Sequence, residues 1–133
     1  MAYSDNAQII SLTAGSTFAA SDLYKFVDLD SDGNAIISVS TNNSMPMGVL
    51  YGVTKTTSTD SEKVPVAIGG VVKVRMTAST AAAGNFVAAS SIGLGIIPTT
   101  NRFIVGRIVE GTSGAVNRIV TMLWRPGPNS ATP

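Results

Sequence analysis

The sequence has no histidine and no cysteine, and these two absences exclude several classes of chemistry. Without histidine the chain lacks the imidazole base of a catalytic triad, the usual general acid at neutral pH and the commonest zinc ligand. Without cysteine it can form neither disulfides nor thiolate metal sites. The eight acidic residues include no pair that the sequence places in a pocket, and no lysine stands in a nucleophile motif. We therefore expect a protein that is not an enzyme and binds no cofactor.

Charge is also scarce, because charged residues make up only 13% of the chain. That share is about half the average of globular proteins. A protein that stays apart from its neighbours usually keeps a charged surface, so a charge-poor surface is typical of a chain that is covered in an assembly. A Ser/Thr-rich β protein outside any assembly would have a similar composition. The nine Lys and Arg residues are scattered and give a net charge of only +1, so we expect no nucleic-acid partner.

Long hydrophobic runs are missing as well. The longest apolar stretch, residues 64–72, is far too short to cross a bilayer and contains Pro65 and two glycines. The N-terminal residues MAYSDNAQ lack the basic region and apolar run of a signal peptide. We expect no membrane partner.

Three strands, joined by a turn and a polar loop, are predicted for residues 26–53 (FVDLDSDGNAIISVSTNNSMPMGVLYGV). Asp32-Gly33-Asn34 favours the tight turn, because Gly tolerates positive φ and Asp and Asn bond to their own backbone. Residues 47–53 are rich in the β-branched and aromatic residues that suit a half-buried strand. No helix is needed to explain this pattern, and the chain as a whole is predicted to be all-β.

The same pattern recurs about sixty residues later, which indicates a duplicated supersecondary block. The shift places Phe26 on Phe86 and Gly33 on Gly93. Two further stretches align across small gaps, residues 47–50 with 105–108 and residues 64–68 with 119–123. We expect a single β domain over residues 9–125, with the two blocks at about 19–76 and 79–125. A polar N-terminal arm (1–8) and a Pro-rich C-terminal tail (126–133) are expected to extend from it.

Several turns and strands inside the domain can be predicted individually. Gly69-Gly70 predicts a bend or a bulge between strands 64–68 and 71–76, which together are expected to form a hairpin with Lys73 and Arg75 on its wet face. Pro65 favours an edge strand or a strand start, because proline cannot donate to a β-ladder.

The last predicted strand, residues 115–125, follows a turn at 111–114 and is apolar on both faces. Apolar residues on both faces suit a strand that a neighbouring subunit approaches, and equally a central strand of one sandwich.

Asp28, Asp30 and Asp32, followed by Gly33, match the first half of an EF-hand calcium loop. The second half fails, because the twelfth position is Val39, where a bidentate Glu is required, and the flanks have the pattern of strands. A calcium site of another kind and an acidic hairpin turn both fit these residues. We favour the turn, because turns prefer these residue types.

The order of these motifs resembles that of the capsid cement, or head decoration, proteins of tailed bacteriophages. The resemblance is carried by residues 26–33, with their Asp-x-Asp-Gly turn, and by Pro46-Met47-Gly48-Val49-Leu50. Residues 106–111 (GRIVEG) and a last strand ending near Trp124 are similar to the C-terminal half of that family. The resemblance covers most of residues 8–125 and leaves out the arm and the tail.

The resemblance implies a compact β-barrel or β-tulip-like domain, commonly trimeric, on the outer surface of a phage capsid. Such a protein would be made in the host cytoplasm, bind the major capsid protein and clamp the lattice against internal DNA pressure. Its predicted partners are therefore the major capsid protein and other copies of itself in a homotrimer. The predicted interface residues are Tyr3, Ile9, Trp124, Arg125 and Pro126. For Trp124 a place in the core is an equally good interpretation.

A second hypothesis is a head-fibre or tail-associated module that binds a host receptor or a glycan. Such a module would carry exposed aromatic residues on its loops for stacking on sugars. The predicted loops at 40–46, 54–63 and 111–114 contain none.

Overall fold

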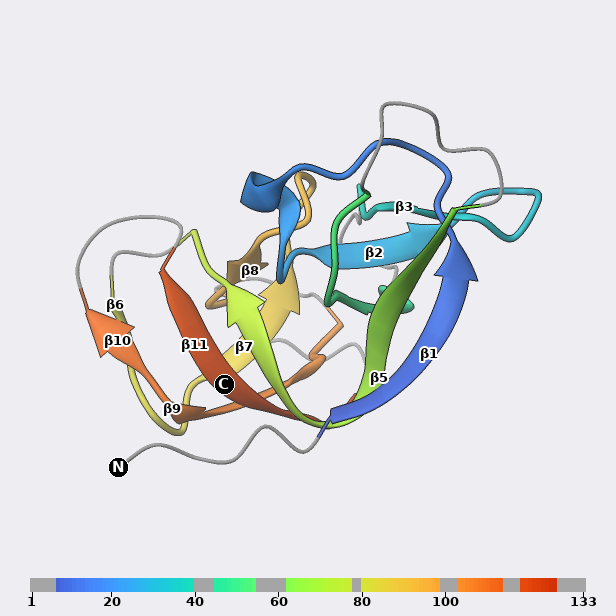
Figure 1. Cartoon of the computed structure of the whole chain (residues 1–133). Helices are drawn as coiled ribbons and strands as arrows, with labels where there is room; N and C mark the ends of the chain where they lie inside the picture. The colour runs from blue at the N-terminus through green and yellow to red at the C-terminus, as the bar shows by residue number, and fades with distance from the viewer. Residues whose placement is uncertain are drawn as a thin grey trace.

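The computed structural model describes residues 7–39, 45–54, 62–77, 80–98, 103–113 and 118–126. The prediction of an all-β fold is confirmed: the described residues form a curled, half-barrel antiparallel sheet of nine strands and a separate two-stranded sheet (Figure 1). The only helical element among them is a short 3₁₀ turn, η1 (Ala20–Asp22). No helix in these ranges is long and apolar enough to span a membrane.

The described residues contain eleven strands. In order these are β1 (Ala7–Thr13), β2 (Phe26–Leu29), β3 (Ala35–Ile37), β4 (Gly48–Leu50), β5 (Lys63–Arg75), β6 (Thr80–Ala81), β7 (Phe86–Ala89), β8 (Gly95–Ile96), β9 (Gly106–Glu110), β10 (Thr112–Ser113) and β11 (Ile119–Trp124). In the large sheet the order is β3-β2-β4-β5-β11-β9-β7-β8, with β1 also paired to β5.

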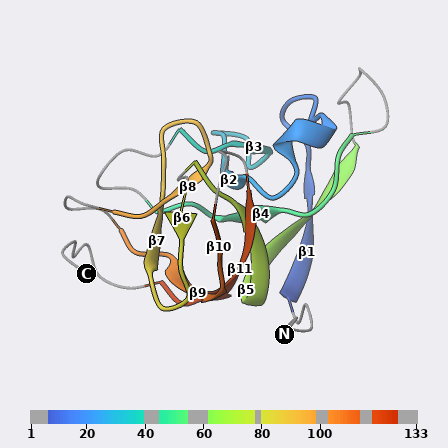
Figure 2. The ribbon, with the colours of Figure 1, turned by 90° about the vertical axis from the view of Figure 1, so that its left-hand side faces the viewer.

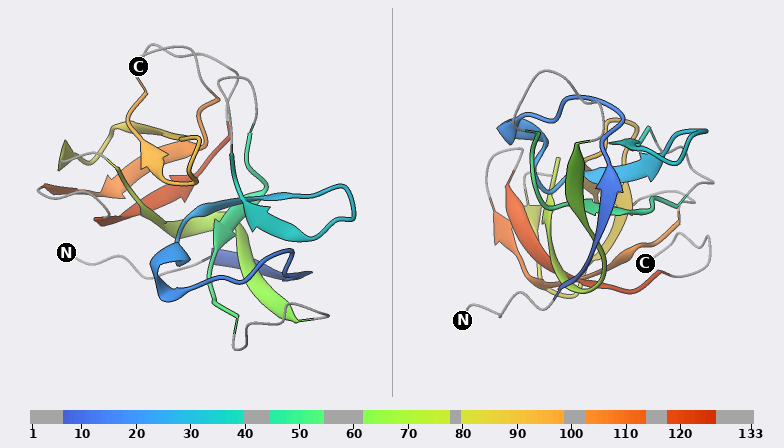
Figure 3. Two further views of the ribbon diagram at one scale, coloured as in Figure 1. Left: turned by 90° about the horizontal axis from the view of Figure 1, so that it is seen from above. Right: turned by 45° about the vertical axis from the view of Figure 1, so that its right-hand side comes forward.

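Strand β5 joins two similar blocks. Its first part pairs with β1 and β4, and its residues 71–75 pair with β11. We define the first block as β1–β4 with residues 63–67 of β5, and the second block as residues 71–75 of β5 with β7, β8, β9 and β11. Seen from above, the two blocks lie on opposite sides of the molecule, with β5 running between them (Figure 3, left).

The bend or bulge predicted at Gly69-Gly70 is present, but the prediction that it joins the two strands of a hairpin is wrong. Residues 63–75 form one continuous strand, which bends sharply so that its two arms enter different blocks (Figure 1). The bend coincides with a register shift opposite Gln8 and Ile9 of β1, and Gly70 has φ 83. An extra residue and a left-handed glycine turn the strand without ending it.

Pro65 is not on an edge strand, because β5 pairs with both β1 and β4, but it is the third residue of β5 and so lies at a strand start, which was the other alternative. It pairs in register with Ser11 of β1, and its carbonyl accepts the N–H of Tyr51 at 2.9 Å on the side of β4 (Figure 2 shows β1 alongside β5). The missing donor is tolerated because β4 has already ended at Leu50. The predicted turn at 111–114 is also wrong in part, since Thr112–Ser113 form β10, which pairs with β6.

The two blocks share the same cross-strand pairs. Phe26 pairs with Val49 between β2 and β4, and Phe86 pairs with Arg107 between β7 and β9. Asp28 pairs with Ile36, and Ala88 with Ile96. These pairs match the alignment expected from the sequence.

The last aligned strand needs a correction of one residue. Val49 pairs with Ala67, whereas Arg107 pairs with Leu123, so Ala67 corresponds to Leu123 and not to Met122. The repeat also begins earlier than expected. Bridges from Ala14 to Ala35 and from Met76 to Gly95 show that β1 corresponds to the second arm of β5.

The two blocks contribute differently to two hydrophobic cores. The smaller core belongs to the first block, under β1, and contains Ala14, Phe18, Val27, Ala35, Leu50, Val64 and Val66. The main core combines the opposite face of the first block (Phe26, Val49, Ala67) with the inner face of the second (including Val72, Val74, Val87, Ile108, Val120 and Met122). The face of the first block that carries Phe26, Val49 and Ala67 therefore packs on the inner face of the second block.

Candidate functional site

The acidic motif in the first block forms a hairpin turn between β2 and β3. Asp30 Oδ1 accepts the N–H groups of Asp32 and Asn34, each at 2.9 Å, and Gly33 has φ 83. These hydrogen bonds, that from Asn34 first, hold the pKa of the Asp30 carboxyl below its ordinary value. Ser90 repeats this arrangement in the second block, where its Oγ accepts the N–H groups of Ile92 and Leu94.

The three aspartates do not converge on one point. Asp28 lies within β2, where its carboxylate accepts hydrogen bonds from the Ser38 hydroxyl at 2.8 Å and from the Met47 N–H at 3.2 Å. Asp32 is exposed at the tip of the turn. In the ranges that the structure describes, no group of three or more His, Cys, Asp or Glu could hold a metal ion.

The predicted interface residues lie in different places. Ile9, on β1, is 46% exposed. Trp124 is half-buried and packs against the main core, with its ring 6.3 Å from that of Phe26. Arg125 and Pro126 are exposed beyond the end of β11, and Tyr3 lies outside the described residues. The structure therefore supports the core position for much of the Trp124 ring.

An exposed row of side chains crosses the outer face of the second block. It runs Phe86, Arg107, Leu123 and Val71 over β7, β9, β11 and β5, and we call it the outer row. Directly paired residues of antiparallel strands point to the same face, so the four side chains are neighbours. The corresponding row of the first block runs Phe26, Val49, Ala67 and Ile9.

The two rows differ in burial although their backbones correspond. Phe26, Val49 and Ala67 are completely buried, because the second block covers them. In the outer row Arg107 is exposed, and Phe86, Leu123 and Val71 are only half-buried. Thus the same position of the repeat is core in one block and surface in the other.

Arg107 lies against its neighbour in the outer row, Phe86. Its guanidinium carbon lies 4.8 Å from the centre of the Phe86 ring, and its Nε and Nη2 donate to the Gly84 carbonyl at 3.1 and 3.0 Å. An arginine stacked on an aromatic ring in this way keeps a charged group at the surface with little loss of rotamer freedom on binding.

The rest of this face carries two basic residues, one acidic residue, Glu110, which pairs with Thr121, and apolar side chains. Lys73 and Arg75 pair with Thr121 and Ile119 of β11 on the same side as Leu123, and Ile119 is 41% exposed. A hydrophobic surface that also carries arginine is typical of protein interfaces. The outer row and these neighbours are the candidate site. Sequence reasoning aligned Val49 with Arg107 but drew nothing from the difference between them. An apolar residue in one block and a charged residue at the same position of the other indicate that this position is buried in the first block and exposed in the second.

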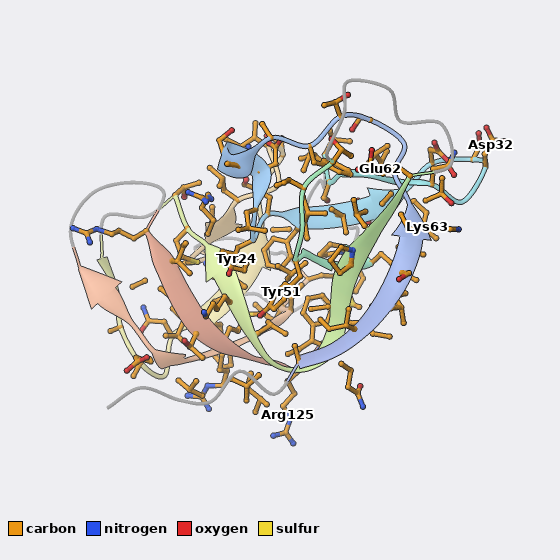
Figure 4. The ribbon with its side chains drawn as sticks, viewed as in Figure 1. Tyr24, Asp32, Tyr51, Glu62, Lys63 and Arg125 are labelled. Atoms are coloured by element: carbon orange, nitrogen blue, oxygen red, sulfur yellow. The ribbon has the colours of Figure 1, made fainter. Side chains whose placement is uncertain are left out.

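A second cluster lies where β5 passes between the blocks. Tyr24 packs edge-on against Tyr51, with ring centres 5.2 Å apart, and Lys73 Nζ lies 5.8 Å from the Tyr24 ring (Figure 4). Tyr24 has φ 69 and corresponds to Gly84, with φ 91, in the second block. Its carbonyl accepts the Arg75 N–H, and the Tyr51 hydroxyl accepts the Lys73 N–H. The cluster holds the second arm of β5 against the first block, which is a structural role.

Comparison with known proteins shows a similarity in fold. No family model and no curated protein matches the chain. A solved structure, described as the head fiber gp8.5 N base in bacteriophage phi29, is similar in fold with a TM-score of 0.61. The similarity covers 89% of this chain and 93% of that chain, at 18% sequence identity. At this identity the similarity shows that the two chains share a fold.

Proposed function

We propose that this chain is a structural protein of a bacteriophage head, bound to the outer surface of the capsid. The observation that carries the proposal is the shared fold with a phage head-fibre base over nearly the whole of both chains. The motif resemblance to capsid cement proteins supports the same place in the virion independently. The scarcity of charge, at 13% of residues, suits a surface that is covered in an assembly. The proposal includes no catalytic activity.

A cement role explains how such a chain would act. A ligand that binds the assembled lattice more tightly than free subunits stabilises the lattice by mass action. When copies of the chain are linked, the overall affinity for the lattice is higher than that of a single contact, because each further contact forms at a high effective concentration. The predicted partner is the major capsid protein, and the predicted effect is resistance of the filled head to internal pressure.

The cement role predicts that particles lacking this chain lose their DNA at lower temperature. The temperature at which DNA is released would be measured with a DNA-binding dye, on wild-type particles and on particles from a phage whose gene for this chain has been deleted. Adding back the purified chain should restore the release temperature of wild-type particles, whereas chain unfolded beforehand should not. Identical release temperatures with and without the chain would contradict the cement role.

A head-fibre base is the second candidate, and the description of the similar structure favours it. In this role the chain would attach a further appendage to the head and add little to lattice stability. Deletion would then leave the DNA-release temperature unchanged and remove an appendage visible by electron microscopy.

A further inference from the structure

The two blocks carry opposite net charges. Residues 1–70 contain seven acids and three bases, a net charge of −4, whereas residues 71–133 contain six bases and one acid, a net charge of +5. The boundary lies at the bend of β5, so it coincides with the boundary between the blocks. The net charge of the whole chain is small, but its first half (residues 1–70) is acidic and its second half (residues 71–133) is basic.

The molecule has an acidic end. Asp32 and Glu62 lie there, at the tip of the β2–β3 hairpin and just before β5, and Arg125 lies at the other end (Figure 4). One base, Lys63, also lies at the acidic end, where its Nζ donates to the Thr13 hydroxyl at 2.8 Å (Figure 4). The turn uses the carboxylate of Asp30 for its hydrogen bonds, which leaves the exposed Asp32 carboxylate directed to solvent. Lys73, Arg75 and Arg107 share the outer face of the second block.

The repeat shows how this outer face differs from a face that is already covered. Val49, Ser11 and Thr13 of the first block correspond to Arg107, Lys73 and Arg75 of the second. Basic residues thus replace uncharged ones, while Phe86 and Leu123 stay apolar at positions whose counterparts are completely buried. The face combines an apolar centre with three basic neighbours and one acidic neighbour, Glu110, so it is basic on balance and the surface complementary to it would be acidic.

We infer that the outer row of the second block binds the acidic end of the first block in a second copy of this chain. The same molecule supplies both complementary surfaces, and their separation at opposite ends favours a head-to-tail contact. Contacts of this kind use two different surfaces; they close into rings, the smallest with three subunits, when the rotation between copies closes, and form open filaments when it does not. The inference concerns the purified chain, so it can fail while the proposed place in the virion holds, and the reverse.

The test is the mass of the full chain in solution, measured by light scattering after size exclusion. The wild type should associate at low salt and dissociate toward a single chain at about 1 M salt, where charge interactions are screened within a few ångströms. Arg107→Glu and Asp32→Lys should each weaken association by about tenfold or more, because each places like charges across the contact. Lys63→Glu, an equal charge reversal at the acidic end itself, should keep or strengthen association, because it adds a negative charge to the surface that meets the basic outer row.

Mixing the two variants separates this contact from any other. The intact acidic end of the Arg107→Glu chain can bind the intact outer row of the Asp32→Lys chain, and the reversed charges at positions 107 and 32 attract each other as well, so the mixture should regain the wild-type mass. This recovery also shows that both variants are folded. A wild type that is a single chain at low salt, single variants that keep the wild-type mass, or a mixture that stays monomeric would each overturn the inference.

Discussion

At the scale of the residue, the two hairpin turns show how different side chains fill one role. Asp30 and Ser90 each place an oxygen acceptor at the start of the turn, and each accepts two backbone N–H groups. Sequence reasoning identified the first turn from its Asp and Gly residues. It aligned Gly33 with Gly93 but placed Ser90 at the end of a predicted strand, because serine is a weaker turn signal than aspartate.

The charge of Asp30 makes the first turn sensitive to acid. Its folded pKa is lowered, so its stabilising effect is present above the unfolded pKa and is lost as pH falls through the folded pKa. Asp30→Ser copies the second turn and removes this titration. Thermal unfolding followed down the acid range should show a smaller loss of stability in the variant than in the wild type. Parallel curves would show that Asp30 does not contribute.

Gly33 and Gly93 form a matched pair for measuring local packing. Both have positive φ, so Ala costs about 1 to 2 kcal/mol at either position. A Cβ at Gly33 meets no atom within 4 Å, whereas one at Gly93 lies 2.7 Å from Ile37 Cγ2 and 3.2 Å from the Phe26 carbonyl oxygen. Gly93→Ala should therefore lower the free energy of unfolding by roughly 1 kcal/mol more than Gly33→Ala. Equal losses in denaturant titrations would contradict the packing of this turn against β2.

At the scale of the element, β5 is where sequence reasoning failed most clearly. Two glycines between alternating segments have the pattern of a hairpin, and local pattern cannot distinguish a hairpin from a bulged, bent strand. The outcome depends on which strands pair with each arm, and those partners, β1, β4 and β11, lie far away in sequence.

Gly48 and Gly106 occupy the same position in their blocks and allow a close approach of neighbouring strands. A Cβ at Gly48 would collide with the Ala67 carbonyl oxygen, and one at Gly106 with the Leu123 carbonyl oxygen. Backbone atoms in a sheet cannot move aside cheaply, so each Gly→Ala change should cost about 3 kcal/mol or more. Denaturant titrations should show both losses, with Ser11→Ala, at an exposed strand position, as a nearly neutral control. Tolerance of Ala at either glycine would contradict the strand spacing described.

At the scale of the whole molecule, the blocks depend on each other. The main core takes Phe26 and Val49 from the first block and Val87 and Met122 from the second, and β5 runs through both. We therefore expect one cooperative unfolding transition, with circular dichroism and tryptophan fluorescence giving the same midpoint. Two separated transitions would show that the blocks are stable independently.

The duplication could be predicted from the sequence, but the stacking of the blocks could not. Aligned residues such as Phe26 and Phe86 reveal equivalent strands and faces. Which face of one block covers which face of the other depends on the bend of β5, and that geometry has no local signature. For this reason sequence reasoning missed the outer row, which is the main feature of the candidate site. Ile9 and Arg125 are exposed, which agrees with their predicted interface role but does not test it.

The most direct test of the account is the copy number of this chain relative to the major capsid protein, measured by quantitative mass spectrometry. The sample would be purified heads made from the genome that encodes it. A cement protein presented as linked copies predicts a ratio of roughly one to one. A few copies per head would contradict the cement role and favour the fibre base, and absence of the chain from the heads would contradict the proposed place in the virion altogether.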